Sequence, residues 1–310
     1  MVSVVVPTCN RAHLVGRALR SVLAQTVSDF EVFAVDDGST DNTADVLAAI
    51  DDRRMRTVRL EENGGVSRAR NTAIALARGE WMAFLDDDNE WAPNYLERQL
   101  DLAVSRAGAD VVYCRAWRLN ERTGQDGLLP LVIREGPVFR HLVNRWQPPT
   151  SCTMVRRSRL IEIGGFDEGL RVAEDYDLWL RLAQHTDFAG TAEILVVRYE
   201  HSGEHLFRNT ELHARAVAVL ERRWEPAIKA RCGRTAYRRW RARLFANLAF
   251  SRVVQAVEAR RYLEAAHSAA RMAWLLPWSA AYLARVLAFT ILGPRAYGRL
   301  AARRQRLVRK

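Results

Sequence analysis

Two clusters of acidic side chains have the composition of a binding site for a phosphorylated ligand. Asp36 and Asp37 are adjacent, and Asp86, Asp87 and Asp88 form a run of three. Carboxylates accept hydrogen bonds from a base or a ribose hydroxyl. Adjacent carboxylates repel one another unless a cation is bound, and such oxygen ligands suit Mg²⁺ or Mn²⁺ bridging a diphosphate. The simpler explanations are a turn with a helix cap and an exposed acidic loop.

Two other segments carry residues that can act in such a site. Glu174 and Asp175 stand at the start of a predicted helix, where the helix dipole favours acids, and Asp175 can deprotonate a substrate hydroxyl. Gly65 precedes another predicted helix and permits close backbone approach, so Arg68 or Arg70 can meet a phosphate there. Ordinary first-turn acids and a plain turn give the same two patterns, so neither is decisive alone.

Short β-branched runs alternate with helical spacing over the first hundred residues. We predict strands over 2–6, 31–35, 55–60 and 81–85, and helices over 14–23, 43–50, 66–77 and 93–105. This alternation indicates an α/β fold with a mostly parallel, doubly wound sheet. Ligands of such sheets bind beyond the carboxyl ends of the strands. The acidic clusters follow two of these strands directly, which favours ligand binding over exposed loops.

Charge divides the chain into two parts. Residues 1–204 carry a net charge of −7, whereas residues 205–310 carry 23 Lys and Arg against 5 Asp and Glu, a net of +18. We therefore predict a catalytic domain over 1–204 and a helical, basic region over 205–310. A basic region suits an anionic membrane surface or nucleic acid. The apolar stretch 273–292 is long enough to span a membrane, but Pro277 and Arg285 favour an interfacial or packed helix equally.

The cysteines and the N-terminus indicate a reducing compartment. Cys9, Cys114, Cys152 and Cys232 lack the spacing of a zinc site and are interpreted as reduced core residues. The chain enters a strand pattern at once, without a charged segment before an apolar stretch, so we expect no secretory signal. We expect the protein in the cytoplasm.

In order and spacing, the motifs resemble those of family 2 inverting glycosyltransferases, whose catalytic domain has the A-type nucleotide-sugar-binding fold, related to the Rossmann fold. The matching segments are 5–11, 23–26, 35–41, 63–65 with 69–71, 84–88, 164–168 and 174–179. The resemblance covers about residues 2–204 and fades beyond. Many relatives have a fourth acid where this chain has Asn89.

The resemblance implies a role for each matching position. Asp175 matches the catalytic base and Glu174 its acidic neighbour. Asp88 matches the direct metal ligand, Asp86 lies nearer the ribose or sugar as a second ligand, and His201 matches a histidine that some members use on the metal or diphosphate. The donor-binding positions are Pro7, Thr8, Asn10, Arg11, Asp36, Asp37, Gly65, Arg68, Arg70, Asp86 and Asp87.

The resemblance also implies a metal-dependent hexosyltransferase of polysaccharide or glycolipid biosynthesis. Its cofactor would be Mn²⁺ or Mg²⁺, its donor a UDP-sugar, and its acceptor a glycan or a lipid-linked molecule. Together with the basic C-terminus, which ends in Arg309 and Lys310, this predicts peripheral attachment to the inner face of the plasma membrane.

Two other functions compete with this prediction. A nucleotidyltransferase would carry a glycine-rich, lysine-bearing loop after the first strand, where this chain has Pro7 to Arg11. A non-enzymatic nucleic-acid binder would explain the basic region but not the acidic clusters, and the chain has no recognised nucleic-acid motif. We therefore expect no nucleic-acid partner.

Overall fold

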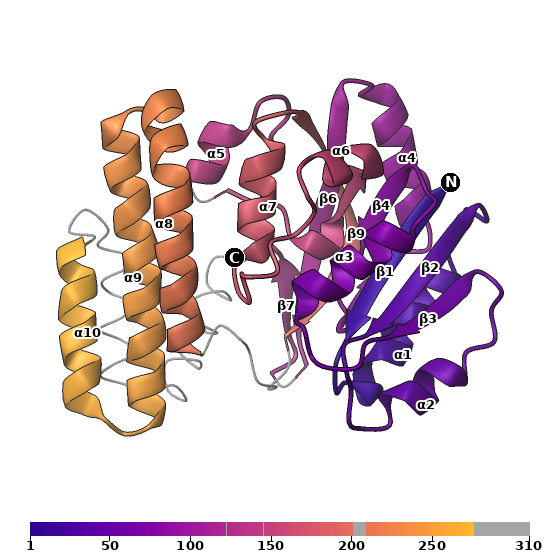
Figure 1. Ribbon diagram of the computed structural model, residues 1–310, viewed down its shortest axis with the longest axis horizontal. Coiled ribbons are helices and arrows are strands. Elements are labelled where there is room, and N and C mark those ends of the chain that lie inside the picture. Colours follow the sequence, from indigo (N-terminus) through magenta and orange to yellow (C-terminus); the bar gives the residue numbers. More distant parts are fainter. Residues whose placement is uncertain (122, 145, 201–208, 276–310) are drawn as a thin grey trace. The chain divides into compact units, whose positions relative to one another are not determined.

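The chain divides into two compact units, Met1–Ser202 and Gly203–Lys310. A computed structural model of the protein describes residues 1–121, 123–144, 146–200 and 209–275 (Figure 1). The four cysteines are free thiols. Cys114 and Cys152 are buried core residues as predicted, whereas Cys9 and Cys232 are only half-buried.

The first unit is built on one sheet of nine strands among its described residues, eight of them in the order β3-β2-β1-β4-β8-β6-β9-β5, with β7 paired to β6. The strands are β1 (Val2–Thr8), β2 (Phe30–Asp36), β3 (Met55–Arg59), β4 (Trp81–Phe84), β5 (Asn89–Trp91), β6 (Ala109–Asn120), β7 (Gln125–Leu128), β8 (Thr153–Arg156) and β9 (Asp187–Glu200).

The N-terminal half of the sheet is parallel, and its crossovers are helical. β3, β2, β1 and β4 run in the same direction, joined by α1 (Ala12–Leu23), α2 (Thr43–Ala48) and α3 (Val66–Leu76). The strand order reverses direction after β3, and right-handed crossovers therefore put α3 on the face opposite α1 and α2 (Figure 1). The predicted doubly wound α/β fold is confirmed here.

The second half of the sheet is mixed. β8 lies antiparallel between β4 and β6, while β6 and β9 are parallel and β5 pairs antiparallel with the end of β9. The accompanying helices are α4 (Tyr95–Ser105), α5 (Phe139–Val143), the 3₁₀ turn Thr150–Cys152, α6 (Arg157–Glu162) and α7 (Glu174–Leu182). α7 begins at Glu174, where the sequence predicts the start of a helix.

Alternate residues of the central strands form the core. Val2, Val4 and Val6 of β1 face one side of the sheet and belong to the same buried cluster as Val15 and Leu19 of α1. Successive strand side chains point to opposite faces, so a strand buried on both faces reads as a continuous apolar run. This explains why β1 is mostly apolar; before Thr8 its one polar residue is the buried Ser3, whose hydroxyl donates to Glu31 of β2.

The second unit contains three described helices: α8 (Thr210–Cys232), α9 (Arg234–Glu258) and α10 (Tyr262–Leu275). The Asn209 side chain accepts hydrogen bonds from two N–H groups at the start of α8, and Gly233, at φ +89°, joins α8 to α9. Small side chains such as Ala246 and Ala265 form the buried contact between α9 and α10. The predicted helical C-terminal region is confirmed.

No helix in the described part of the chain is long and apolar enough to cross a membrane. Of the apolar stretch 273–292, residues after 275 lie outside the described residues.

Candidate active site

The carboxyl ends of β1 and β2 meet side by side, with Thr8 opposite Asp36. Asp36 accepts a hydrogen bond from the Ser39 N–H at 2.9 Å and so closes the turn that follows β2. Asp37 accepts from the N–H groups of Gly64 and Gly65 at 2.8 and 2.7 Å. The two acids therefore hold two loops against the end of the parallel sheet.

Gly65 stands where no other residue fits without strain. Its φ is +91°, and a Cβ atom there would lie 2.1 Å from a guanidinium nitrogen of Arg171. Residues that carry a Cβ atom rarely adopt such a φ. Asn10, at φ +54°, makes the matching connection after β1: its Oδ1 accepts from the Thr40 N–H at 2.7 Å. Asn10 and Gly65, both predicted donor-binding residues, thus shape the loops around the site.

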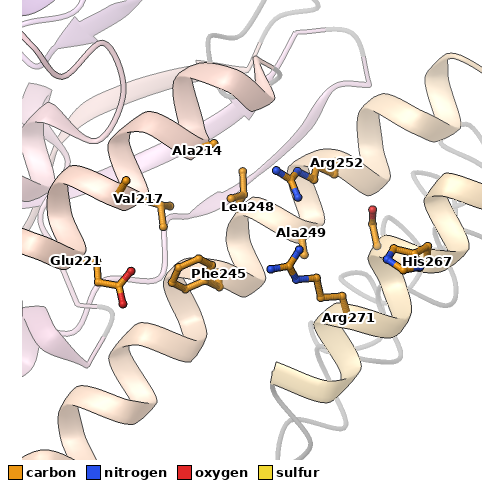
Figure 2. A pocket seen from close by; sticks show the side chains of 11 residues that line it. Ala214, Val217, Glu221, Phe245, Leu248, Ala249, Arg252, His267 and Arg271 are labelled. Atoms are coloured by element: carbon orange, nitrogen blue, oxygen red, sulfur yellow. The ribbon is translucent and has the colours of Figure 1, made fainter.

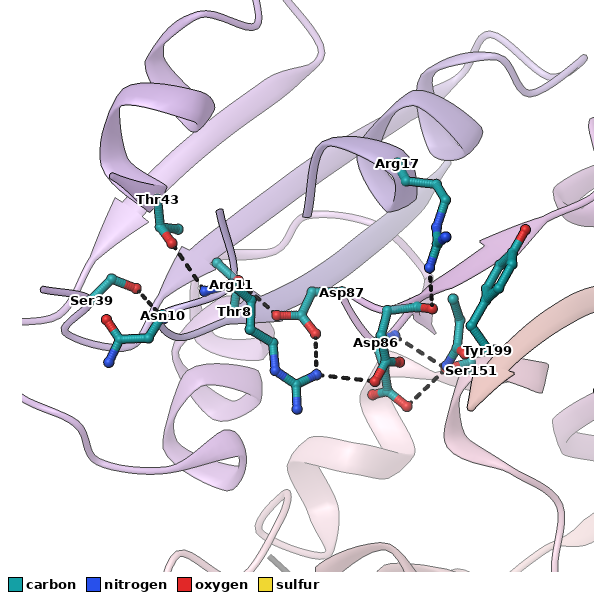
Figure 3. Close-up of polar contacts among 12 residues, drawn as sticks. Thr8, Asn10, Arg11, Arg17, Ser39, Thr43, Asp86, Asp87, Ser151 and Tyr199 are labelled. Atoms are coloured by element: carbon teal, nitrogen blue, oxygen red, sulfur yellow. Dashed lines mark hydrogen bonds and ion pairs between the residues drawn. The ribbon is translucent and has the colours of Figure 1, made fainter. Parts of the chain in front are cut away.

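The three acids after β4 have three different surroundings. The Asp87 carboxylate turns inward, where it accepts from the Thr8 hydroxyl at 2.7 Å and from Arg11 at 2.9 Å (Figure 3). Arg11 also donates to Asp88 at 3.0 Å. Burial raises the pKa of Asp87 to about 6, although Arg11 and Thr8 act to lower it. Arg11 therefore joins the end of β1 to two of the three acids.

Asp86 is held by Ser151, a residue that the sequence did not indicate. The Ser151 hydroxyl donates to the Asp86 carboxylate at 2.9 Å and accepts from the Asp86 N–H at 3.1 Å and from the Asn89 amide at 2.9 Å (Figure 3). Burial acts to raise the pKa of Asp86, but Arg70 and this hydroxyl outweigh it, so the net shift is downward. Ser151 lies in the 3₁₀ turn Thr150–Cys152, directly after Pro148 and Pro149, where the local sequence gives no sign of a contact with the acids.

Arg70 connects the end of β4 to the start of α7. Its guanidinium, with only 4% of the side chain exposed, donates to Asp86 at 2.8 Å and to Glu174 at 3.0 Å. It lies over the Phe166 ring at 4.9 Å. Because Arg70 already pairs with both acids, it positions these carboxylates in this state instead of standing free for a phosphate. Arg68, the other predicted phosphate-binding arginine, is half-buried and pairs with Glu62 at 3.3 Å.

Asp175 occupies the first turn of α7, next to Glu174. Burial and the neighbouring charge of Glu174 raise its pKa to about 7, against weaker lowering by the Tyr176 N–H and by Arg70. Gln147 donates to its carboxylate at 3.3 Å. The residue before the helix, Ala173, has φ +60°, a conformation that a non-glycine residue rarely adopts. A carboxylate that titrates near neutral pH has the property required of a general base.

The structure thus brings most of the predicted residues into two linked groups. Thr8, Arg11, Asp87 and Asp88 form the first, and Arg70, Asp86, Glu174 and Asp175 form the second; the run 86–88 joins them. Pro7 is buried within β1 beside these residues. His201 lies outside the described residues.

The predicted metal ligands are Asp86, Asp88 and His201. Within the described ranges, no group of three His, Cys, Asp or Glu side chains is placed to hold a metal ion. Mg²⁺ is commonly held by one or two carboxylates and completed by substrate phosphates and water. The Asp86 and Asp88 side chains, 35% and 20% exposed, have this oxygen chemistry and fit such a partial site.

Comparisons with known proteins identify the family of this chain. The family model for glycosyl transferase family 2 matches residues 3–169, more than half of the chain. The succinoglycan biosynthesis protein ExoO of Rhizobium meliloti (strain 1021) is 36% identical over 192 residues, which are 57% of this chain and 54% of ExoO. The chain spans between 34% and 66% of the length of the curated relatives it matches.

Two solved structures share the fold. S. aureus TarS 1–349 in complex with UDP-GlcNAc has a TM-score of 0.57 at 17% identity, over 94% of this chain and 92% of TarS 1–349. The mannosyltransferase PcManGT from Pyrobaculum calidifontis, in complex with GDP-Man and Mn²⁺, has a TM-score of 0.56 at 21% identity, over 100% of this chain and 80% of that one. With the family match over residues 3–169, these findings show that the chain belongs to glycosyl transferase family 2.

Proposed function

We propose that this protein transfers a sugar from a nucleotide-sugar donor to an acceptor hydroxyl, with inversion at the anomeric carbon. The observation that carries the proposal is the Asp175 carboxylate. It is held beside the Arg70–Glu174 ion pair with a pKa raised to about 7. Membership of family 2 supports the reaction class, and the name of ExoO supports a role in polysaccharide biosynthesis.

In the proposed reaction Asp175 acts as the base. Its carboxylate takes the proton of the acceptor hydroxyl as the oxygen attacks the anomeric carbon. The bond from that carbon to the donor diphosphate breaks, and the nucleoside diphosphate leaves with the bonding electrons. General-base assistance of this kind typically contributes about 10²–10⁴ in rate. Arg70 pairs with Glu174 at 3.0 Å and so holds it in place next to the base.

Asp86 and Asp88 are the residues that would hold a divalent metal ion, with His201 as a further candidate. A bound Mn²⁺ or Mg²⁺ would offset the charge that develops on the leaving diphosphate. The complex of PcManGT with Mn²⁺ supports this assignment. The nucleotide would then be surrounded by Thr8, Arg11 and the loop that Asp37 holds at Gly64 and Gly65. Our first choice of donor is a UDP-sugar, because TarS was solved with UDP-GlcNAc.

A thermal-shift panel of UDP-, GDP- and dTDP-sugars, each with Mn²⁺ and with a chelator, tests the proposal. A donor at 100 times its dissociation constant stabilises the fold by about 2.7 kcal/mol. A domain of about 200 residues gains roughly 2–4 °C per kcal/mol, so the correct donor should raise the melting temperature by about 5–10 °C. The shift should fall when Mn²⁺ is chelated. If every nucleotide sugar left the melting temperature unchanged, the donor site would be refuted.

We also propose that the basic C-terminal unit attaches peripherally to the anionic inner face of the plasma membrane, close to a lipid-linked or glycan acceptor. Each Lys or Arg near an anionic surface contributes about 1 kcal/mol. The full chain should float with anionic vesicles at low salt and be released at high salt. Equal recovery with neutral and anionic vesicles would refute this attachment.

A further inference from the structure

A cavity of about 310 Å³ lies within the C-terminal unit, between α8, α9 and α10 (Figure 2). This volume is in the range of small-ligand sites. One side of the cavity is apolar: Val217 of α8 and Leu248 and Ala249 of α9 are buried, and the half-buried ring of Phe245 closes it. We call this space the helical cavity.

The other side of the helical cavity is cationic. Arg252 of α9 and His267 and Arg271 of α10 lie together at this side (Figure 2). Within the described residues Arg252 and Arg271 have no ion-pair or hydrogen-bond partner. Other basic side chains of the unit are paired with acids, for example Arg215 with Glu211 and Lys229 with Glu225. Among the described residues, two positive charges thus remain without an acidic partner beside an apolar wall.

The acid that lines the helical cavity does not cancel these charges. Glu221 lies at the far side, beyond Phe245, from the two arginines (Figure 2). Its carboxylate already pairs with Arg241 and accepts a hydrogen bond from the Tyr237 hydroxyl. An anion placed between Arg252 and Arg271 therefore meets positive charge without a nearby free carboxylate.

The outer face of α10 has the composition of a segment at a membrane interface. Leu263 is 89% exposed and Trp274 is 79% exposed. They are eleven residues apart, which is close to three full turns at 3.6 residues per turn, so they lie on the same side of the helix. A large apolar side chain and a tryptophan beside basic residues are typical of interfacial helices. The same helix supplies two of the three basic groups of the helical cavity.

We propose that the helical cavity binds the phosphate end of an anionic membrane lipid. The phosphate would lie between Arg252 and Arg271 with His267 beside it, and the first methylene groups of the lipid would lie against Phe245 and Leu248. Charge complementarity selects the phosphate, and the apolar wall selects a lipid over free phosphate or a nucleotide. The site is separate from sugar transfer and needs no donor.

Binding to the full-length protein is measured by calorimetry with three soluble probes: dihexanoyl phosphatidic acid, dihexanoyl phosphatidylcholine and inorganic phosphate. We expect binding of phosphatidic acid at least tenfold tighter than of inorganic phosphate, because only the lipid also contacts the apolar wall. We expect the zwitterionic lipid to bind more weakly than phosphatidic acid. If inorganic phosphate binds as tightly as phosphatidic acid, the lipid assignment is wrong.

Two variants locate the site. Replacing Arg252 and Arg271 together by Gln should weaken binding of phosphatidic acid roughly 30-fold, which corresponds to about 2 kcal/mol. The matched control replaces Arg238 and Arg239 by Gln: both are exposed on α9 outside the cavity, and the net charge changes equally. Ala218→Trp fills the cavity from an exposed position without a charge change and should also abolish binding.

Equal losses in the cavity pair and the control pair would overturn the proposal, because they would indicate general attraction to a basic surface. Unchanged binding in Ala218→Trp, with a wild-type melting temperature, would also overturn it. Both results leave sugar transfer and its thermal-shift test untouched. Loss of vesicle flotation while dihexanoyl phosphatidic acid still binds would count against membrane attachment alone.

Discussion

Replacing Asp175 by Asn tests the proposed base, because an amide fills the same space and cannot take a proton. The hydrogen bond from Gln147, at 3.3 Å, can still be accepted by the amide oxygen. Donor contacts should therefore persist, and turnover should fall by about 10²–10⁴. In the wild type kcat/KM should rise with pH up to about 7 and then level off, since this profile reports the pKa of the free protein. In the variant the rise near pH 7 should vanish.

The same substitution should stabilise the fold above neutral pH. The pKa of Asp175 is about 7 in the folded protein against an ordinary value of 3.8. The folded state therefore holds a proton that the unfolded state has lost between those pH values, and stability falls as pH rises through this window. About three pH units correspond to roughly 4 kcal/mol as an upper limit. Because Asp175 is partly exposed, solvent screening reduces this to about 1–2 kcal/mol.

The assay combines release of nucleoside diphosphate with melting temperatures at pH 5 and pH 8. Asp45→Asn is the matched control, since Asp45 is an exposed acid on α2, far in sequence from Asp175. Asp175→Asn should melt above the wild type at pH 8 and show less difference from it at pH 5, whereas the control should follow the wild type at both. Wild-type turnover in Asp175→Asn would show that another group is the base, and a lower melting temperature at pH 8 would refute the electrostatic reasoning.

Three further substitutions probe the supports of the site, each by urea unfolding at pH 7.5. Arg70→Met should destabilise the fold by about 3–5 kcal/mol, since it leaves Asp86 and Glu174 as poorly compensated charges; a loss below 1 kcal/mol would contradict this. Ser151→Ala should cost about 1–3 kcal/mol through the lost hydroxyl bonds to Asp86, with Ser105→Ala as the exposed control. Ala173→Gly should stabilise by about 0.5–1 kcal/mol, because glycine adopts φ +60° without a steric penalty; a destabilised variant would be inconsistent with that conformation.

The parallel half of the fold could be predicted because each element there has a local signal. β1 and β2 are short, mostly apolar segments, and α1 carries apolar residues at helical spacing, so the period and length of the apolar pattern distinguish strand from helix. β5 and β8, of three and four residues, were not predicted. Segments this short contain no full period, and they become strands because β9, β4 and β6 supply their hydrogen bonds.

The acids of the candidate site could also be predicted, whereas their partners could not. Asp86 directly follows a predicted strand, and Asp175 stands at the start of a predicted helix. The resemblance to family 2 adds the role of each residue. Ser151 and Gln147 lie in the loop region between α5 and β8, and their contacts depend on how that loop folds back over the sheet. The local sequence carries no signal for such contacts, because Asp86 and Ser151 are 65 positions apart in the chain.

The contacts of Asp86, Asp87 and Asp88 change the interpretation of this run of three aspartates. Adjacent carboxylates suggest a bound metal because their repulsion needs a cation. Here Arg70 and Arg11 supply positive charge to Asp86 and Asp88, and Thr8 donates to Asp87, so protein groups already meet much of that need. A metal ion arriving with the donor would therefore compete with these arginines for the same oxygens. Each arginine that gives up an acid would gain the donor diphosphate as a new anionic partner, so the exchange of partners can be close to neutral in free energy. Such an arrangement predicts that metal and donor would bind more strongly together than either would alone.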